Sequence, residues 1–149
     1  MADLGDHILS EIPAAERLGF RLVDARDGGA RSKVSLAPNL NHLGTFFGGS
    51  LYAAGALTCY AGLRALLESE GLPAKNIVIA RGDIHYLAPA QGDIEIVSHA
   101  SPESVRAFLS EFRTRGRGRI KIEGKIFEGL KLVAKIRGAY LARAEDKSS

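Results

Sequence analysis

The sequence predicts an α+β fold, in which an antiparallel sheet of about five to six strands wraps around one long central helix. Residues 48–70 are rich in Ala, Leu and Gly, are apolar on nearly every face as far as Arg64, and end before Gly71 and Pro73, which stop a helix. Residues 76–143 instead contain runs in which apolar and polar side chains alternate, as in strands with one buried face. Because a helix that is apolar all round must be buried, we expect the strands to enclose it.

The N-terminal part of the chain predicts one short helix and one hairpin. Residues 4–12 place apolar side chains on one helical face before Pro13, which is typical of a short amphipathic helix that packs as a lid. Residues 18–25 and 31–36 are alternating runs, and the Asp-Gly-Gly sequence at residues 27–29 between them favours a turn. A polar loop then leads into the central helix.

The second half predicts four strands and one short helix. The strands are expected at residues 76–87, 93–100, 119–127 and 131–143. Between the second and third of them, Ser101 followed by Pro102 is typical of a helix start, and we expect this helix to reach about Thr114. With no repeat or linker along the chain, residues 1–144 are predicted to form a single domain, and residues 145–149 a polar C-terminal tail.

Composition indicates an ordinary globular protein. Hydrophobic residues make up 46% of the 149 residues and charged residues 25%. No apolar run approaches the roughly 20 residues that cross a bilayer, so no membrane partner is expected. The N-terminus lacks the features of a secretory signal, and the single cysteine, Cys59, cannot form an internal disulfide. We therefore expect a cytoplasmic protein with Cys59 as an inert core residue.

Basic residues are concentrated in one part of the chain. The stretch from Arg113 to Arg143 holds ten Lys and Arg residues against Glu123 and Glu128, although the whole chain has a net charge of only +3. This asymmetry favours an anionic partner, either a nucleic acid or a phosphorylated molecule such as coenzyme A. An alternative is that the charges form the solvated face of two strands. Nucleic acid is disfavoured because no aromatic residue is interleaved between Arg113 and Arg119. The four histidines and one cysteine show no metal-ligand spacing, so we expect no metal site.

The loop before the central helix is the strongest functional signal. It begins at Asn41 and ends in the paired glycines Gly48 and Gly49, directly before the long apolar helix. The first N–H groups of a helix have no partner within the helix and carry a partial positive charge, and glycines allow a ligand to approach them closely. The sequence therefore predicts a site that binds a carbonyl oxygen or a phosphate.

Residues 35–54 resemble the entry to the central helix of hotdog-fold acyl-CoA thioesterases, with the pattern Asn-x-x-Gly-x-x-x-Gly-Gly. They look most like the thioesterase family typified by the YiiD C-terminal domain. The resemblance also covers Ile12-Pro13, Leu18-Gly19 and residues 86–89 (Tyr-Leu-Ala-Pro), and so spans nearly the whole chain. It implies a hotdog fold, a homodimer or higher homo-oligomer with the site at the subunit interface, and a coenzyme A thioester as substrate, with no cofactor.

The match to better understood hotdog thioesterases is partial. In the phenylacetyl-CoA type the motif reads Asn-x-x-Gly-x-x-His-Gly-Gly, with a carboxylate eight positions after the first paired glycine. Here Asn41 and the glycines match, whereas Phe47 stands at the histidine position and Ala56 at the carboxylate position. The resemblance implies that the N–H of Gly48, supported by Gly49, polarises the thioester carbonyl. It also implies that Asn41 positions water or the pantetheine arm, since an amide cannot act as a general base.

A replacement for the missing base is expected on the strand after the central helix. Asp83 and His85 are two residues apart and share one face of that strand. In hotdog dimers this strand lies at the subunit interface, so either residue could reach the partner's site, and Asp83 is the better candidate. The alternative for Asp83 is a structural ion pair with Arg81 or the partner subunit, and the alternative for His85 is an ordinary interface histidine.

Further residues are predicted to contact substrate. His42 lies beside Asn41 and titrates near neutrality, although an exposed loop histidine is the alternative. Ser50 and Tyr52 fall in the first helical turn, and Phe47 is expected to line an acyl pocket. The remaining candidates, Arg113 and Arg115, could hold the phosphates of coenzyme A.

Three functions follow from these residues. The first is an acyl-CoA thioesterase in which water attacks a thioester polarised at the start of the central helix. The second, motivated by Phe47 and Ala56, is a non-catalytic module that binds acyl-CoA or acyl-carrier protein. A more distant alternative is a hotdog dehydratase, which would need His42 or His85 to face Asp83 across a dimer.

Overall fold

The computed structural model describes residues 3–145, and residues 146–149 of the predicted C-terminal tail lie outside them. The helices are α1 (Leu4–Glu11), α2 (Pro13–Leu18), α3 (Gly48–Ser69) and α4 (Pro102–Arg115), with a 3₁₀ turn η1 (Ala37–Asn39) before α3. The strands are β1 (Phe20–Arg26), β2 (Gly29–Val34), β3 (Asn76–Tyr86), β4 (Ile94–His99), β5 (Arg117–Glu128) and β6 (Lys131–Arg143). They confirm the predicted α+β fold, because the six strands form one sheet in the order β1-β2-β4-β5-β6-β3 and every neighbouring pair is antiparallel.

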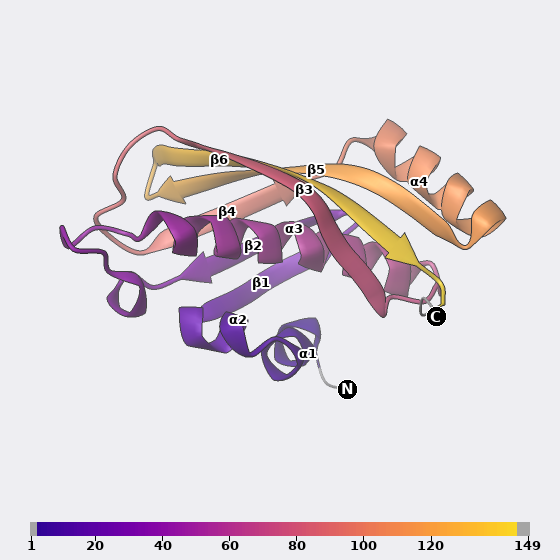
Figure 1. Cartoon of the computed structure of the whole chain (residues 1–149), viewed down its shortest axis with the longest axis horizontal. Coiled ribbons are helices and arrows are strands. Elements are labelled where there is room, and N and C mark those ends of the chain that lie inside the picture. The colour runs from indigo at the N-terminus through magenta and orange to yellow at the C-terminus, as the bar shows by residue number, and fades with distance from the viewer. Residues whose placement is uncertain (1–2, 146–149) are drawn as a thin grey trace.

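The sheet curves around α3 (Figure 1). The helices α1 and α2 lie beside β1 at one edge of the sheet, and α4 lies at the end of the molecule away from the start of α3. At the other edge, β3 pairs only with β6, so one side of this strand has no neighbour in the described chain.

The N-terminal prediction was incomplete. The sequence predicted one helix and a strand beginning at residue 18, whereas Pro13 begins a second helix, α2, and β1 begins only at Phe20. Proline at the first position of a helix is favourable because its missing N–H would have no partner there. Gly19 then ends α2 in the left-handed conformation, with φ of 75°, which suits glycine.

The helix α3 is buried because most of its faces pack against the sheet, as its composition predicts. The approach is closest at Gly62, where an added Cβ would lie 2.8 Å from the carbonyl carbon and oxygen of Gly28 in the hairpin turn. A glycine is therefore required for this helix to reach this turn.

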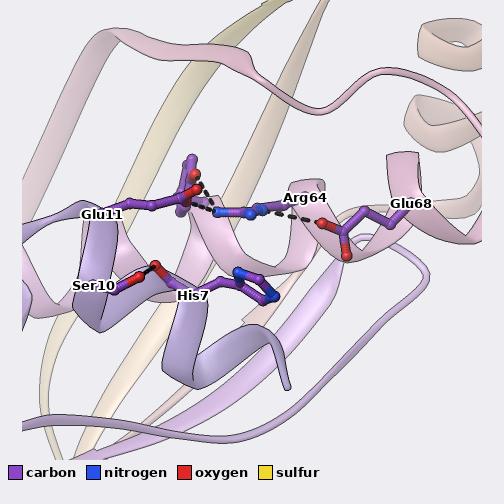
Figure 2. Close-up of polar contacts among 6 residues, drawn as sticks. His7, Ser10, Glu11, Arg64 and Glu68 are labelled. Carbon is purple, nitrogen blue, oxygen red and sulfur yellow. Dashed lines mark hydrogen bonds and ion pairs between the residues drawn. The ribbon is translucent and has the colours of Figure 1, made fainter. Parts of the chain in front are cut away.

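A cluster of ion pairs and hydrogen bonds links α1 to the second half of α3 (Figure 2). The Arg64 side chain is only 10% exposed, and its guanidinium donates to Glu11 Oε1 at 2.5 Å, to Glu68 Oε1 at 3.2 Å and to the Tyr60 hydroxyl at 3.2 Å. Burial opposes the charge, but the bond to Glu11 and the neighbouring Tyr60 outweigh it, so the pKa of Arg64 is raised. The predicted lid helix α1 thus packs along the second half of α3, away from its start.

The strands β5 and β6 alternate as the sequence predicts. Along β5, the even-numbered residues from Gly118 to Ile126 are buried and the odd-numbered ones from Arg117 to Lys125 are exposed. Because the buried side chains face α3, the basic residues of β5 and β6 point away from it, onto the outer face of the sheet. The predicted solvated face of two strands is therefore present.

Candidate functional site at the start of α3

The first turn of α3 has no side-chain cap. Its N-cap residue is Phe47, whose carbonyl accepts from the N–H groups of Ser50 at 3.0 Å and Leu51 at 3.1 Å. Within the described chain, the N–H groups of Gly48 and Gly49 have no hydrogen-bond partner. Helices usually begin with Ser, Thr, Asp or Asn because such side chains satisfy these donors. Here two donors at the positive end of the helix remain available to a ligand.

Two aromatic rings lie close to these glycines. The Phe47 ring, on a residue that is 55% exposed, lies over Gly49, where an added Cβ would come within 2.6 Å of it. An added Cβ at Gly48 would lie 3.4 Å from the Tyr86 ring. The exposed, apolar ring of Phe47 therefore lies beside the start of α3. The predicted acyl-pocket role of Phe47 requires this position, although the role itself stays a prediction.

Tyr86 also contacts the start of α3, which was not predicted from the sequence. It ends β3, and its hydroxyl donates to the carbonyl oxygen of Gly48 at 2.8 Å. Burial, and secondly the neighbouring Tyr52, raise the pKa of Tyr86. This bond ties the start of α3 to the edge strand of the sheet. The available signal was its place in the Tyr-Leu-Ala-Pro segment that carries the family resemblance.

Tyr52 lies on the same side of α3 and points toward β3. Its hydroxyl lies so close to Gly82 that an added Cβ there would be only 1.8 Å away. Ser50, in the first turn, is buried at 9% exposure. Both residues therefore lie near Gly48, as predicted, whereas contact of either with a substrate stays a prediction.

The Asn41 side chain shapes the loop before α3. Its Oδ1 accepts from the N–H groups of Leu43 at 2.9 Å and Thr45 at 3.0 Å, and its Nδ2 donates to Thr45 Oγ1 at 2.8 Å. These bonds close a turn that holds His42 exposed. Because the acceptor oxygen is already used twice, only one N–H of this amide remains for water or substrate.

The structure does not bring Asp83 and His85 to the start of α3. Along β3, Gly82 lies against Tyr52 and Ile84 packs in the core, so the alternating residues Asp83 and His85 lie on the outer face of the sheet. Neither residue is thus placed to act as the base at Gly48 of its own chain. A role for either residue at the site of a partner subunit stays a prediction.

Arg113 and Arg115 also lie away from this site. The guanidinium of Arg113 donates to Glu70, the C-cap residue of α3. Since α3 has 22 residues, its two ends are roughly 33 Å apart. Within one chain, these arginines therefore cannot reach a phosphate that is bound beside Gly48.

Cys59 lies eleven residues after Gly48 along α3. Cys59 is fully buried, as predicted, and burial raises its pKa to about 12, so its thiol is inert. Among residues 3–145, no three His, Cys, Asp or Glu residues are grouped to hold a metal ion. No helix in this part of the chain is long and apolar enough to cross a membrane.

An antiparallel sheet that curves around one long helix is the architecture of hotdog-fold proteins of the thioesterase type. A family model described as "Putative thioesterase (yiiD_Cterm)" matches residues 1–144, and the chain belongs to this family. This match confirms the resemblance found in the sequence. Among curated proteins, none matches the chain significantly.

Solved structures agree with this assignment. The chain is 26% identical to a protein of unknown function from Chlorobaculum tepidum TLS, with a TM-score of 0.87 over 95% of this chain and 93% of that chain. It is 27% identical to a protein from Shewanella oneidensis described as a putative thioesterase, with a TM-score of 0.84 over 94% of each chain. A probable thioesterase from Pseudomonas aeruginosa shares the fold at 21% identity, with a TM-score of 0.73 over 95% of each chain.

Proposed function

We propose that this protein hydrolyses acyl-CoA thioesters at the start of α3. The proposal rests on one observation, the uncapped first turn in which the N–H groups of Gly48 and Gly49 have no partner in the described chain. Two such donors, fixed on a buried helix, suit the oxygen of a thioester carbonyl.

In the proposed reaction, water attacks the thioester carbon and the carbonyl oxygen becomes an oxyanion beside Gly48 and Gly49. The C–S bond then breaks, coenzyme A leaves as a thiol, and the proton lost by water passes through solvent to the sulfur. The donors strengthen their hydrogen bonds as charge develops on the oxygen, so they stabilise the transition state more than the substrate. With Ala56 at the position where relatives keep a carboxylate, the protein relies on this stabilisation rather than on a base.

The test is release of free thiol from short, medium, long and aromatic acyl-CoAs, and from an acyl-carrier protein bearing the preferred acyl group. We expect saturable turnover of at least one coenzyme A thioester above the rate in buffer. If the protein bound these thioesters but hydrolysed none of them, the result would instead support the second candidate, a non-catalytic binding module. That candidate is favoured by the absence of an acidic side chain in the first turns of α3 and by the outward position of Asp83.

The edge strand β3 supports a homodimer as part of this proposal. It is 11 residues long, one side of it has no neighbouring strand in the described chain, and its apolar residues Val78 and Ile79 are 60% and 39% exposed. A long apolar edge of this kind pairs readily with another strand. A second copy that added its own β3 here would bury this edge and place two α3 helices under one continuous sheet.

Replacing Ile79 by lysine should convert the dimer to a monomer. A charge on the face of β3 that packs toward α3 would be buried by the second copy, whereas it can reach solvent in the free chain. Sedimentation velocity would show the change in mass. Val23→Lys is the matched control, since Val23 is 45% exposed on β1, at the opposite edge of the sheet. A wild-type chain that sediments as a monomer would reject the dimer.

Removing the hydroxyl of Tyr86 should slow turnover without weakening substrate binding. Tyr86→Phe keeps the ring beside Gly48 but deletes the bond to its carbonyl, so the donors are held less firmly. A bond of about 0.5–1.5 kcal/mol corresponds to a roughly two- to tenfold lower kcat at unchanged KM. Tyr140→Phe is the control, because its hydroxyl donates to the Ala56 carbonyl in the middle of α3. We expect the control to lower the melting temperature with kcat unchanged, and an equal loss of kcat in both variants would assign Tyr86 a purely structural role.

A further inference from the structure

A groove of about 740 Å³ crosses the outer face of the sheet, on the side away from α3. It spans β4, β5, β6 and β3, and the backbone of the paired residues Gly124 and Ile136, which face α3, forms its floor. Its volume lies in the range of roughly 300–1,000 Å³ that small-molecule sites occupy. Because the groove and the start of α3 lie on opposite faces of the sheet, it is separate from the site described above.

The strand register arranges the charged side chains of the groove in two rows. In the first row, acidic residues alternate with Arg137 and His99, in the order Asp83, Arg137, Glu123, His99. In this row, each acidic side chain therefore has a basic or titratable neighbour directly across a strand boundary. Opposite charges in such cross-strand positions stabilise a sheet, so the first row is balanced.

The second row has no acidic residue. Its order across the strands is His85, Lys135, Lys125, Val97, so the two lysines are directly opposite one another on β6 and β5. Both are exposed, and neither takes part in any ion pair found in the described chain. Like charges directly opposite destabilise a sheet, and an anion between the two ammonium groups would remove this repulsion.

Apolar side chains lie beside these lysines. Val97, 42% exposed, is directly opposite Lys125 on β4, and the half-buried Phe127 follows two residues further along β5. Together they form an apolar corner of the groove next to its excess positive charge. A ligand that fits both features has a phosphate at one end and a flat or apolar group at the other.

We propose that this groove is a second ligand site, which binds a small organic phosphate of nucleotide type. Lys125 and Lys135 hold the phosphate, and Val97 and Phe127 contact the base. Glu123 lies two residues from Lys125, and Asp83 lies two residues from His85, which is opposite Lys135, so a long phosphodiester strand would meet repulsion along the same groove. The site does not depend on the proposed thioesterase activity, and its ligand is distinct from the thioester that binds at Gly48.

Titration of the whole protein with adenosine 3′,5′-bisphosphate by calorimetry tests this site, with adenosine and inorganic phosphate as the two component parts of the ligand. We expect saturable binding of the bisphosphate that is tighter than that of either part. The double variant Lys125→Gln with Lys135→Gln should weaken it about tenfold to a hundredfold, because it removes two charge-assisted contacts. Both lysines are exposed, so a thermal melt should show that the double variant stays folded.

The control is the double variant Lys33→Gln with Lys121→Gln, which removes the same charge from exposed positions outside the groove. It should leave binding within about twofold of wild type. Equal losses in both double variants, no binding at millimolar bisphosphate, or tighter binding of a single-stranded oligonucleotide through all four lysines would overturn the proposal. A matching rise in KM for acyl-CoA in the groove variant alone would also overturn it, because the groove would then hold the nucleotide end of the substrate.

Discussion

Substituting proline for Gly48 should lower kcat by about 10²–10³ while the protein stays folded, since one oxyanion donor is typically worth that much. Proline deletes the N–H of Gly48, which has no partner in the described chain, so no internal hydrogen bond is lost. Gly48 is the first residue of α3, where proline is favoured. The preceding residue, Phe47, has φ of −62° and ψ of 130°, which a residue before proline adopts readily.

Gly48→Ala is the matched control for this experiment. Its added Cβ would lie 3.4 Å from the Tyr86 ring, an ordinary van der Waals contact, and its N–H remains. We expect turnover within a fewfold of wild type, measured by thiol release at saturating acyl-CoA. If the proline variant turned over as fast as the alanine variant, Gly48 would not be an oxyanion donor.

Substituting alanine for Gly62 should destabilise the protein by about 2–4 kcal/mol, or lower its melting temperature by roughly 5–15 °C. The added Cβ would lie within 2.8 Å of backbone atoms of Gly28 and 2.9 Å of the carbonyl carbon of Gly29. Backbone atoms cannot rotate away as a side chain can, so α3 or the β1–β2 turn must shift. Urea unfolding followed by circular dichroism measures the free energy of unfolding.

Gly55→Ala offers the comparison within the same helix. There an added Cβ would lie 3.0 Å from both Cδ1 and Cγ2 of Ile136, so a side chain rather than backbone must shift. Alanine also gains about 1 kcal/mol in helix propensity over glycine. We therefore expect a much smaller loss of stability for Gly55→Ala, and a Gly62→Ala protein as stable as wild type would contradict the close approach of α3 to the turn.

The fold could be predicted because its main elements have strong local patterns. The length and apolar composition of α3 leave no solvent-facing side, and the period-2 alternation of β5 and β6 requires one covered face. The helix α2 was missed because it has only six residues, and Pro13 was interpreted as the end of one helix rather than the start of another. Tertiary contacts, not local pattern, stabilise an element this short.

The candidate site was only partly predictable. The paired glycines and Phe47 are neighbours in the sequence, so their place at the start of α3 followed from the helix boundary. Tyr86 lies 38 residues after Gly48, and only the folded sheet shows that its hydroxyl reaches that carbonyl.

The polar candidates illustrate the same limit. Alternation shows that Asp83 and His85 share a face, but not that this face points away from α3. Likewise, the sequence could not show that Arg113 lies beside Glu70, at the opposite end of α3 from the glycines. Each of these positions depends on contacts between residues that are far apart in the sequence.

The most direct test of a thioester site at α3 is the amide NMR spectrum of Gly48 and Gly49 with two non-hydrolysable acyl-CoA analogues. One analogue replaces the thioester sulfur by methylene and keeps the carbonyl, and the other is a thioether without the carbonyl. We expect both amide protons to shift downfield when the ketone analogue saturates the protein, because they then donate to its oxygen, and to shift much less with the thioether. Equal shifts with the two analogues, at saturation of both, would contradict the proposed role of these donors.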